Sequence, residues 1–439
     1  MQITRFHVIT QKVPAKYYPI LRELRLEAGK IWSDSLNLFF ELLKKNGNTP
    51  KKSEIQKLVK SSLLHSQTTQ AIQDRIFGAL KSYFKNKKQN SNAKPPKPKK
   101  FYNLIWKNQA IRYQNGKLIL PLARATGIKL SVPLRKRKRE WLEELLKNGA
   151  EIRQAEIVFK AFEYRLIILI KETVEINPPD RNKVVALDLG EIHPFVSFDG
   201  KEVLIWNGRL LRSYKQLRLK LIALKQKLLA KKQKESRRWR RIKRSFERQI
   251  AKVERKIEDL EHKLTKAFVK YCKAKGIGTV VIGKIKGIRE RAKYNKNANQ
   301  KIHLMWRFSK LLQKLKYKLE GEGIVVVEED ESYTTQLCPV CGNKYKPKDR
   351  NYICPRCGFS YHRDGVGAIN LFKRFMEKVS GSITIAPTLR VGLTPKLPVD
   401  GLTRPKALIP PKGGMLLWGV RYSLSSSGWV LPTLRNPLL

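Results

Sequence analysis

Acidic residues and cysteines are scarce in this 439-residue sequence. Asp and Glu number 36 against 92 Lys and Arg, which gives a formal net charge of +56. Such an excess of positive charge points to a polyanionic partner, with nucleic acid ahead of an anionic membrane surface. No uncharged apolar run of about 18 residues is present, so we expect no transmembrane helix. Residues 1–10 lack the apolar segment of a signal peptide.

Only five cysteines are present, too few for a disulfide framework. Four of them form two C-x-x-C units that each place two thiolates on one tight turn. Two such turns complete the tetrahedral shell of a structural Zn²⁺ and leave no open position for catalysis. The remaining cysteine, Cys272, lies in an apolar segment and is expected to be an ordinary buried thiol. The predicted zinc ligands are Cys338, Cys341, Cys354 and Cys357.

Periodicity and composition divide the chain into segments. Strand-like alternation at residues 1–15 and 101–180 encloses a helical stretch at 16–90 and a basic, Pro-rich linker at 91–100. Apolar steps of three and four predict an antiparallel helical hairpin between residues 210 and 270. Residues 379–439 are rich in Pro and Gly and show no sustained period, so we expect disorder there.

Carboxylates appear at positions suited to a metal site. Asp188 ends the short apolar strand 184–187, Asp364 stands at the start of a predicted helix, and four acids occupy positions 328–331. Each has an ordinary interpretation as a structural hydrogen-bonding group, a helix cap or a solvated turn. In a chain this basic, however, acids gathered near a phosphodiester suggest Mg²⁺, and two such ions can clamp the oxygens of an in-line hydrolysis.

Four motifs carry a resemblance to a known family. They are Asp188-Leu-Gly after a strand, the segment 332–342 with the first C-x-x-C, the second C-x-x-C-G, and His362-Arg363-Asp364. Together they resemble the TnpB family of transposon-encoded, RNA-guided DNA nucleases, which is related to the compact type V CRISPR effectors. The resemblance covers residues 1–376 in layout and is specific from 184 to 371.

The resemblance implies an α/β fold with an RNase H-like (RuvC) nuclease core, helical insertions and a zinc ribbon. It also implies an N-terminal β-barrel wedge domain with a helical insertion. The expected parts are the wedge at 1–15 and 101–180, the helical recognition insertion at 16–90, the linker at 91–100, the core at 181–336, the ribbon at 337–358 and the last core segment at 359–378.

The family's catalytic acids map only in part onto this sequence. The first corresponds to Asp188 and the third to Asp364, but the usual position of the second holds Gly283. In one TnpB subset and in the related Fanzor proteins, this acid stands two residues before a tyrosine, which here selects Glu331. Glu328 and Glu329 are fallback positions. The alternative is an inactive nuclease that still binds guide RNA and DNA.

Positive charge is concentrated on the predicted hairpin. Eighteen Lys or Arg face only three Glu between residues 215 and 256. A solvated helix surface normally mixes both signs, so this pattern favours a stripe that follows phosphates. The predicted nucleic-acid contacts are Lys231, Lys232, Arg237, Arg238, Arg240, Arg241, Lys243 and Arg244.

The expected function is therefore an RNA-guided, Mg²⁺-dependent DNA endonuclease. Its catalytic and Mg²⁺-binding residues would be Asp188, Glu331 and Asp364, with Zn²⁺ structural, and guide RNA and target double-stranded DNA as partners. Two alternatives stay open: a nuclease-dead, guide-directed repressor, and a compact type V CRISPR effector. The expected location is the cytoplasm of a prokaryote, at the nucleoid when bound to DNA.

Overall fold

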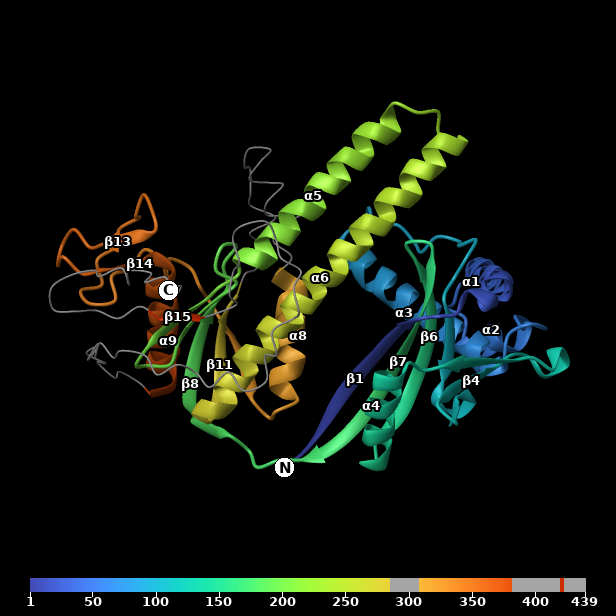
Figure 1. Cartoon of the computed structure of the whole chain (residues 1–439), viewed down its shortest axis with the longest axis horizontal. Coiled ribbons are helices and arrows are strands. Elements are labelled where there is room, and N and C mark those ends of the chain that lie inside the picture. Colours follow the sequence, from blue (N-terminus) through green and yellow to red (C-terminus); the bar gives the residue numbers. More distant parts are fainter. Residues whose placement is uncertain (285–307, 381–418, 422–439) are drawn as a thin grey trace, which may run out of the picture. The chain divides into compact units, whose positions relative to one another are not determined.

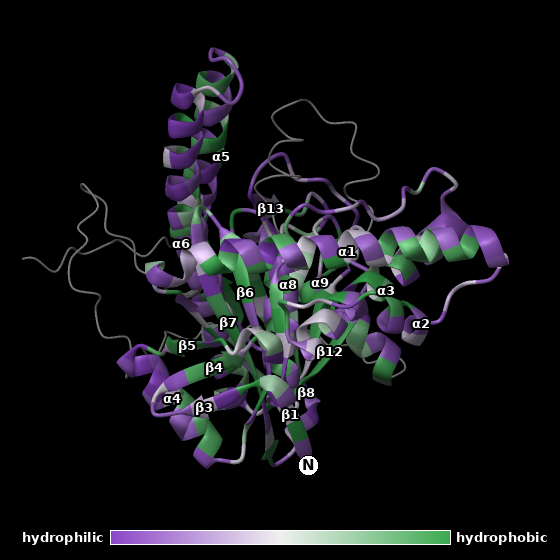
Figure 2. Ribbon diagram, turned by 90° about the vertical axis from the view of Figure 1, so that its right-hand side faces the viewer, coloured by the Kyte–Doolittle hydropathy of each residue, from purple (hydrophilic) through white to green (hydrophobic). Residues whose placement is uncertain are grey.

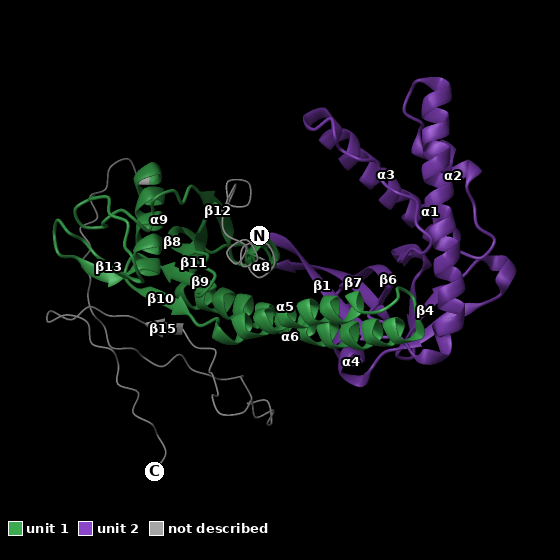
Figure 3. Ribbon diagram, turned by 90° about the horizontal axis from the view of Figure 1, so that it is seen from above, with its two compact units in different colours: residues 1, 176–439 green, residues 2–175 purple. Residues whose placement is uncertain are grey.

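A computed structural model of the chain describes residues 1–284, 308–380 and 419–421. These residues divide into two compact units. One contains residues 2–175, and the other contains Met1 and the chain from Ile176 onward (Figure 3).

The strands of residues 2–175 form two antiparallel sheets. The first has the order β1-β7-β6-β2 and the second β3-β4-β5, and within this unit no strand pairing joins the two sheets into a closed barrel. The β-barrel wedge therefore stays an expectation. The strands are β1 (Gln2–Lys12), β2 (Leu104–Lys107), β3 (Arg112–Gln114), β4 (Lys117–Pro121), β5 (Lys129–Pro133), β6 (Glu151–Lys160) and β7 (Glu163–Glu175).

The helices of this unit pack on the same hydrophobic core as the two sheets. In the longest of them, Leu21, Leu24, Ala28 and Ile31 are buried along one face, as their spacing of three and four residues requires. The helices are α1 (Tyr18–Asn46), α2 (Lys52–Leu58), α3 (Ser66–Gln89) and α4 (Lys136–Lys147).

The Pro-rich segment 91–100 lies along α1. The Trp32 indole donates to the Lys97 carbonyl (3.0 Å), and the Lys99 ammonium lies 3.6 Å from the centre of the Trp32 ring. Gly29 permits this approach, because a Cβ at that position would overlap the Lys100 carbonyl.

The second unit is built on a six-stranded mixed sheet with the order β12-β11-β8-β9-β10-β15 (Figure 1). β11 pairs in parallel with both β8 and β12, whereas β9 pairs antiparallel with β8 and with β10. The strands are β8 (Asp180–Asp188), β9 (Phe195–Phe198), β10 (Val203–Trp206), β11 (Ile277–Gly283), β12 (Val325–Glu329) and β15 (Gly419–Arg421).

Helices cover both faces of this sheet, as expected for an α/β core. Val185 and Leu187 of β8 pack with residues of α6 and α8, while Val184 and Ala186 pack with residues of α9. Two short strands of the cysteine-containing segment pair beside α9. The elements are α5 (Arg209–Ala230), α6 (Arg237–Lys275), α8 (Phe308–Glu320), β13 (Asn351–Ile353), β14 (Ser360–His362) and α9 (Arg363–Ser380).

The periodic segment after residue 208 forms the hairpin α5–α6, with a hydrophilic outer surface and an apolar inner stripe (Figure 2). The Ser236 hydroxyl caps α6 by accepting from the Trp239 amide (3.3 Å). Each glutamate in the basic stretch 215–256 meets a cation: Arg218–Glu254 (3.1 Å), Lys225–Glu247 (3.8 Å) and Arg240–Glu235 (3.2 Å). The stretch keeps a large net positive charge.

The predicted disorder of residues 379–439 falls almost entirely outside the described residues. Within that segment Gly419–Arg421 pairs with β10 as an edge strand. None of the helices in the described part of the chain is long and apolar enough to cross a membrane.

Candidate active site

Three parallel strands end at one edge of the six-stranded sheet. β8 ends at Asp188, β11 at Gly283 and β12 at Glu329, with Ile282 opposite Leu187 and Gly283 opposite Glu329. The carboxyl ends of parallel strands are where ligand sites form in α/β sheets. Asp188 and the position of Gly283 therefore lie side by side, and the chain leaves β12 directly beside them.

Glu331 fills the space above Gly283. A Cβ built at position 283 would overlap Oε2 of Glu331 and would stand 3.2 Å from its Cβ and 3.3 Å from its Cδ. The carboxylate from the turn after β12 therefore occupies the space that a side chain at position 283 would enter. Because Gly283 has no side chain, it leaves the space that the Glu331 carboxylate occupies.

The third acid comes from the start of α9. Asp364 is its second residue and is buried, with 8% of its surface exposed. One turn later Gly367 faces Asp188, since a Cβ on Gly367 would lie only 3.2 Å from Oδ2 of Asp188. The small residue lets α9 approach the end of β8.

The electrostatics of Asp188 and Glu331 reflect this crowding. Burial, together with the charges of Glu331 and Asp364, raises the pKa of Asp188 to about 8. Burial, with a smaller contribution from Asp330, raises the pKa of Glu331 to about 7. Low-dielectric surroundings and neighbouring like charges both disfavour the ionised form. At Asp188 the positive charge of Arg363 opposes this rise in pKa without cancelling it.

Helix α9 also holds the turn that carries Glu331. The Asn370 amide donates to the carbonyls of Thr334 and Leu337 (both 2.7 Å), and Arg374 donates to the carbonyls of Asp330 (2.7 Å) and Ser332 (3.0 Å). A single helix thus positions Asp364 directly and Glu331 through the turn.

The other acids of the 328–331 cluster are engaged elsewhere. Glu328 pairs with Lys316 (2.5 Å), and the buried Glu329 pairs with Lys378 (2.5 Å). Asp330 accepts from the Ser332 hydroxyl (2.8 Å), which lowers its pKa. Of the four acids, Glu331 is the one whose carboxylate lies over Gly283.

Basic groups surround Asp364. Nη1 of Arg350 donates to both of its carboxylate oxygens (2.9 and 2.6 Å), and Nδ1 of His362 accepts from its backbone amide (3.2 Å). The rings of His193 and His362 lie 5.4 Å apart, edge to face. Ligand atoms of these two histidines and Asp364 all lie within 4.8 Å of one another. Burial lowers the pKa of both histidines, so both favour the neutral form.

The donor set fits a hard divalent cation. Carboxylate oxygens are the ligands that Mg²⁺ prefers. Two of the three acids have pKa values raised mainly by burial, with neighbouring negative charges adding to the effect, and the third is paired with a guanidinium. A cation at this edge would relieve the repulsion among Asp188, Glu331 and Asp364.

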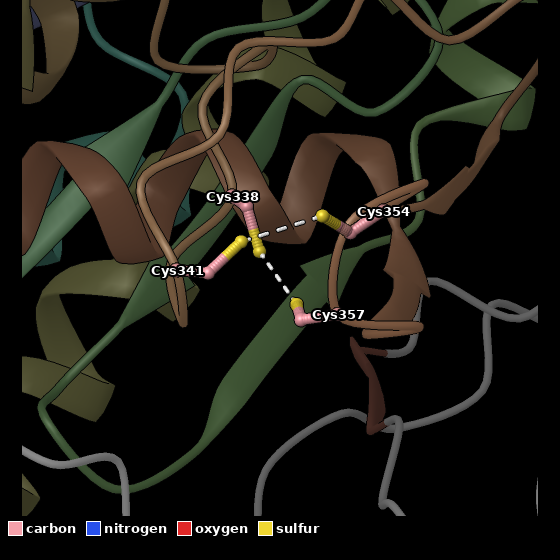
Figure 4. A group of neighbouring side chains, drawn as sticks. All are labelled: Cys338, Cys341, Cys354 and Cys357. Atoms are coloured by element: carbon pink, nitrogen blue, oxygen red, sulfur yellow. Dashed lines mark hydrogen bonds between the residues drawn. The ribbon is translucent and has the colours of Figure 1, made fainter.

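The four cysteines of the two C-x-x-C units converge beside α9 (Figure 4). Sγ of Cys338 lies 3.6 Å from that of Cys357, and Sγ of Cys341 lies 3.5 Å from that of Cys354. All four sulfurs lie within 4.8 Å of one another. A tetrahedral Zn²⁺ with Zn–S bonds of about 2.3 Å requires sulfurs about 3.8 Å apart. The cluster could therefore hold zinc in a closed four-thiolate shell.

Each C-x-x-C unit is a turn closed by the following glycine. The Gly342 amide donates to the Cys338 carbonyl and the Gly358 amide to the Cys354 carbonyl, both at 3.0 Å. The fifth cysteine, Cys272, is fully buried in α6, and burial raises the pKa of its thiol.

Comparisons with known proteins identify the family. A family model described as "Cas12f1-like, TNB domain" matches residues 308–371, and one described as "Probable transposase" matches residues 167–289. The TnpB-like protein MJ0751 of Methanocaldococcus jannaschii is 33% identical over 100 residues, 22% of this chain and 36% of that protein. The putative transposase MJ0856.1 of the same organism is 38% identical over 76 residues, 15% of this chain and 70% of that protein. The chain belongs to the TnpB family.

The fold agrees with that assignment. The structure of a Cas12f1–sgRNA–target DNA complex aligns with a TM-score of 0.62, over 82% of this chain and 83% of that chain, at 15% identity. TnpB proteins are related to such compact type V effectors. The chain matches only about a third of the length of TnpB-like proteins MJ0751 and MJ0012 of M. jannaschii, at 36% and 38%.

The residues predicted for the site of this TnpB protein have the following places in the structure. The structure places Asp188, Glu331 and Asp364 near enough for the charges of Glu331 and Asp364 to act on Asp188. The ligand atoms of the four cysteines lie closer, all within 4.8 Å of one another. It also adds Arg350, which donates to Asp364, and His193, which lies beside His362, two residues that no short-range pattern in the sequence marks. The predicted hairpin cations Lys231, Lys232, Arg237, Arg238, Arg240, Arg241, Lys243 and Arg244 flank the turn between α5 and α6, and six of these eight side chains are exposed.

Proposed function

We propose that this TnpB protein is an RNA-guided, Mg²⁺-dependent DNA endonuclease encoded by a transposon. The observation that carries the proposal is the carboxylate of Glu331 in the space above Gly283, beside Asp188 and Asp364. Asp188, Glu331 and Asp364 come from separate chain segments, and burial together with the charges of Glu331 and Asp364 raises the pKa of Asp188. The fold likeness to a Cas12f1 chain solved with sgRNA and target DNA supports guide RNA and DNA as partners.

In this proposal the three carboxylates hold the metal and orient the reacting phosphate. Bound Mg²⁺ ions supply charge neutralisation at the phosphate and lower the pKa of a coordinated water. Both oxygens of Asp364 accept from Nη1 of Arg350, so this guanidinium would compete with a cation for the carboxylate. Arg350 itself is of the residue type that binds phosphate oxygens well.

The zinc cluster and the hairpin have supporting roles. The C-x-x-C turns lie in the segment that joins Glu331 to Asp364, so zinc would hold together two of the acid-bearing segments. The cations at the turn of α5–α6 would follow phosphates without reading base sequence. In RNA-guided enzymes base pairing with the guide selects the target, whereas the protein recognises backbone shape and a short flanking motif.

The nuclease-dead alternative was based on Gly283. The place of Glu331 weakens that argument, because the missing carboxylate has a substitute in the same space. The choice between a transposon protein and a CRISPR effector depends on neighbouring genes.

Cleavage by the purified complex tests the proposal. The chain is co-expressed with its flanking transcript, and the complex is given Mg²⁺ and a target library with random flanks. We expect cuts that require the guide, Mg²⁺ and Asp188. Guide-dependent DNA binding with no cut at any Mg²⁺ concentration would support the repressor instead.

A further inference from the structure

A half-open cavity of about 570 Å³, lined mainly by polar residues, lies within the unit formed by residues 2–175. Its walls come from α2, the first turns of α3, the 3₁₀ turn Asn108–Ala110 and the chain near Arg124. A second cavity of about 410 Å³ shares His65, Gln109, Ala123 and Arg124 with it, so the two adjoin. The first of these two volumes, about 570 Å³, lies within the range of small-ligand sites, which is about 300–1,000 Å³.

The charged residues that line the cavity are all basic. Among its 14 lining residues five are glutamines, Lys60 and Arg124 bring positive charge, and none is Asp or Glu. Glutamine side chains both donate and accept hydrogen bonds. The lining therefore suits an anionic ligand with several polar edges.

Two buried polar groups in the wall lack a hydrogen-bond partner. Thr69 is 6% exposed and Gln73 is fully buried, and neither Oγ1 of Thr69 nor Oε1 of Gln73 is paired. Nε2 of Gln73 donates to the Val59 carbonyl (3.0 Å), which fixes the amide and leaves its oxygen unpaired. An unsatisfied buried group costs about 1–3 kcal/mol, so ligand donors at these oxygens would be stabilising.

The start of α3 provides groups that would bind the anionic part of such a ligand. This 24-residue helix begins at Ser66, with Ser66 and Gln67 in the lining and His65 accepting from the Gln67 amide (3.2 Å). Burial and then the charge of Arg124 lower the pKa of His65. A helix N-terminus together with the cations Arg124 and Lys60 forms a site for a phosphate.

We propose that this cavity binds one unpaired nucleotide of a nucleic-acid strand. Its phosphate would lie at the α3 N-terminus with Arg124 and Lys60, and base donors would reach Oε1 of Gln73 and Oγ1 of Thr69. The inference deepens the proposed function and rests on it for the nucleic-acid partner. It adds a nucleotide site, and with it a preference for base identity, that is separate from the nuclease acids.

Binding of single nucleotides to the full chain tests the site. The probes are the four nucleoside 5′-monophosphates in ribo and deoxy forms, with inorganic phosphate and ribose 5-phosphate as controls, measured by calorimetry. We expect at least one nucleotide to bind more tightly than ribose 5-phosphate. Thr69→Val should weaken that nucleotide about three- to tenfold through one lost hydrogen bond, without lowering Tm, because it removes an unpaired hydroxyl.

A matched control stands one residue away. Thr68 is also buried, with 1% of its surface exposed, and its hydroxyl is likewise unpartnered, but it does not line the cavity. Thr68→Val should leave nucleotide affinity unchanged. Lys60→Gln should weaken nucleotides and ribose 5-phosphate alike, whereas Lys57→Gln, on α2 outside the lining, should weaken neither.

The proposal is overturned if no nucleotide binds better than ribose 5-phosphate, or if Thr69→Val and Thr68→Val behave alike. Tighter binding of ribonucleotides identifies an RNA strand as the source, because a pocket for RNA can use the 2′-hydroxyl. Equal or tighter binding of deoxynucleotides identifies DNA. Repeating the titration with Asp188→Ala separates this result from the nuclease proposal, since a catalytically inactive chain should keep the nucleotide site.

Discussion

Replacing Asp188 with asparagine should stabilise the metal-free protein at neutral and alkaline pH. The change keeps the shape of the side chain and its ability to accept from the Leu189 amide, but it removes a buried charge near Glu331 and Asp364. The folded protein holds the Asp188 proton to about pH 8, whereas the unfolded chain releases it near pH 3.8. The folded state therefore binds more protons between these values, and the free energy of unfolding falls as pH rises through this window.

The size of the effect follows from the two pKa values. A change from 3.8 to about 8 corresponds to about 6 kcal/mol above pH 8. Local rearrangement of side chains and water reduces the cost of a buried charge to a few kcal/mol. We therefore expect a gain of about 2 kcal/mol for Asp188→Asn at pH 8 in EDTA. In a domain of this size that corresponds to a rise in Tm of about 5 °C.

Thermal unfolding of the wild type and Asp188→Asn from pH 5 to pH 8, in EDTA and in Mg²⁺, measures this gain in stability. Near pH 5 the gain should shrink, because wild-type Asp188 is then protonated in the folded state. Mg²⁺ at ten times its dissociation constant should stabilise the wild type by about 1.4 kcal/mol, and Asp188→Asn much less. The control is Asp180→Asn, at the exposed far end of β8. A destabilised Asp188→Asn at pH 8, or equal Mg²⁺ stabilisation in both proteins, would refute the carboxylate cluster as a metal site.

Three other predictions concern the same unit. Cys354→Ser should release zinc and expose the segment 337–362 to protease, measured by metal content and limited proteolysis; an intact, protease-resistant segment without metal would contradict a structural role. Gly283→Ala should lower cleavage at least about 100-fold, because its Cβ would displace the Glu331 carboxylate and so remove several kcal/mol of transition-state stabilisation. Adding Gly283→Glu to Glu331→Ala should restore part of the activity that Glu331→Ala loses. Arg350→Gln should lower the Mg²⁺ concentration for half-maximal cleavage severalfold, because a competing cation is removed from the third acid; an unchanged or higher requirement would show that the guanidinium does not compete with the metal.

Short-range patterns in the sequence predicted the local parts of the site. The zinc ligands follow from two C-x-x-C turns, and Asp188 from an apolar strand that ends in a carboxylate. The helices α5 and α6 lie where the apolar steps of three and four occur. Each of these patterns lies within one local segment of the chain. It can therefore be recognised without knowing which distant residues pack against that segment.

Contacts between residues far apart in the sequence determine the features of the fold and site that could not be predicted. That Glu331 covers Gly283 depends on the register of β12 against β11 and on the turn held by α9. Arg350 reaches Asp364 only because the cysteine segment folds back on α9. The Pro-rich segment 91–100 was predicted as a linker, yet it packs along α1, where Gly29 leaves room for its backbone. Its prolines exclude helix and central strand but do not exclude packing.

The central claim is that Glu331 supplies the second catalytic carboxylate. The most direct test compares single-turnover, guide-dependent cleavage by Glu331→Gln and Glu328→Gln, two like substitutions three residues apart. Glu328 is paired with Lys316 at the side of the sheet, so its variant should cut at close to the wild-type rate. Glu331→Gln should lose about 1,000-fold or more, as expected for several kcal/mol of transition-state stabilisation. Equal rates for the two variants would contradict the account.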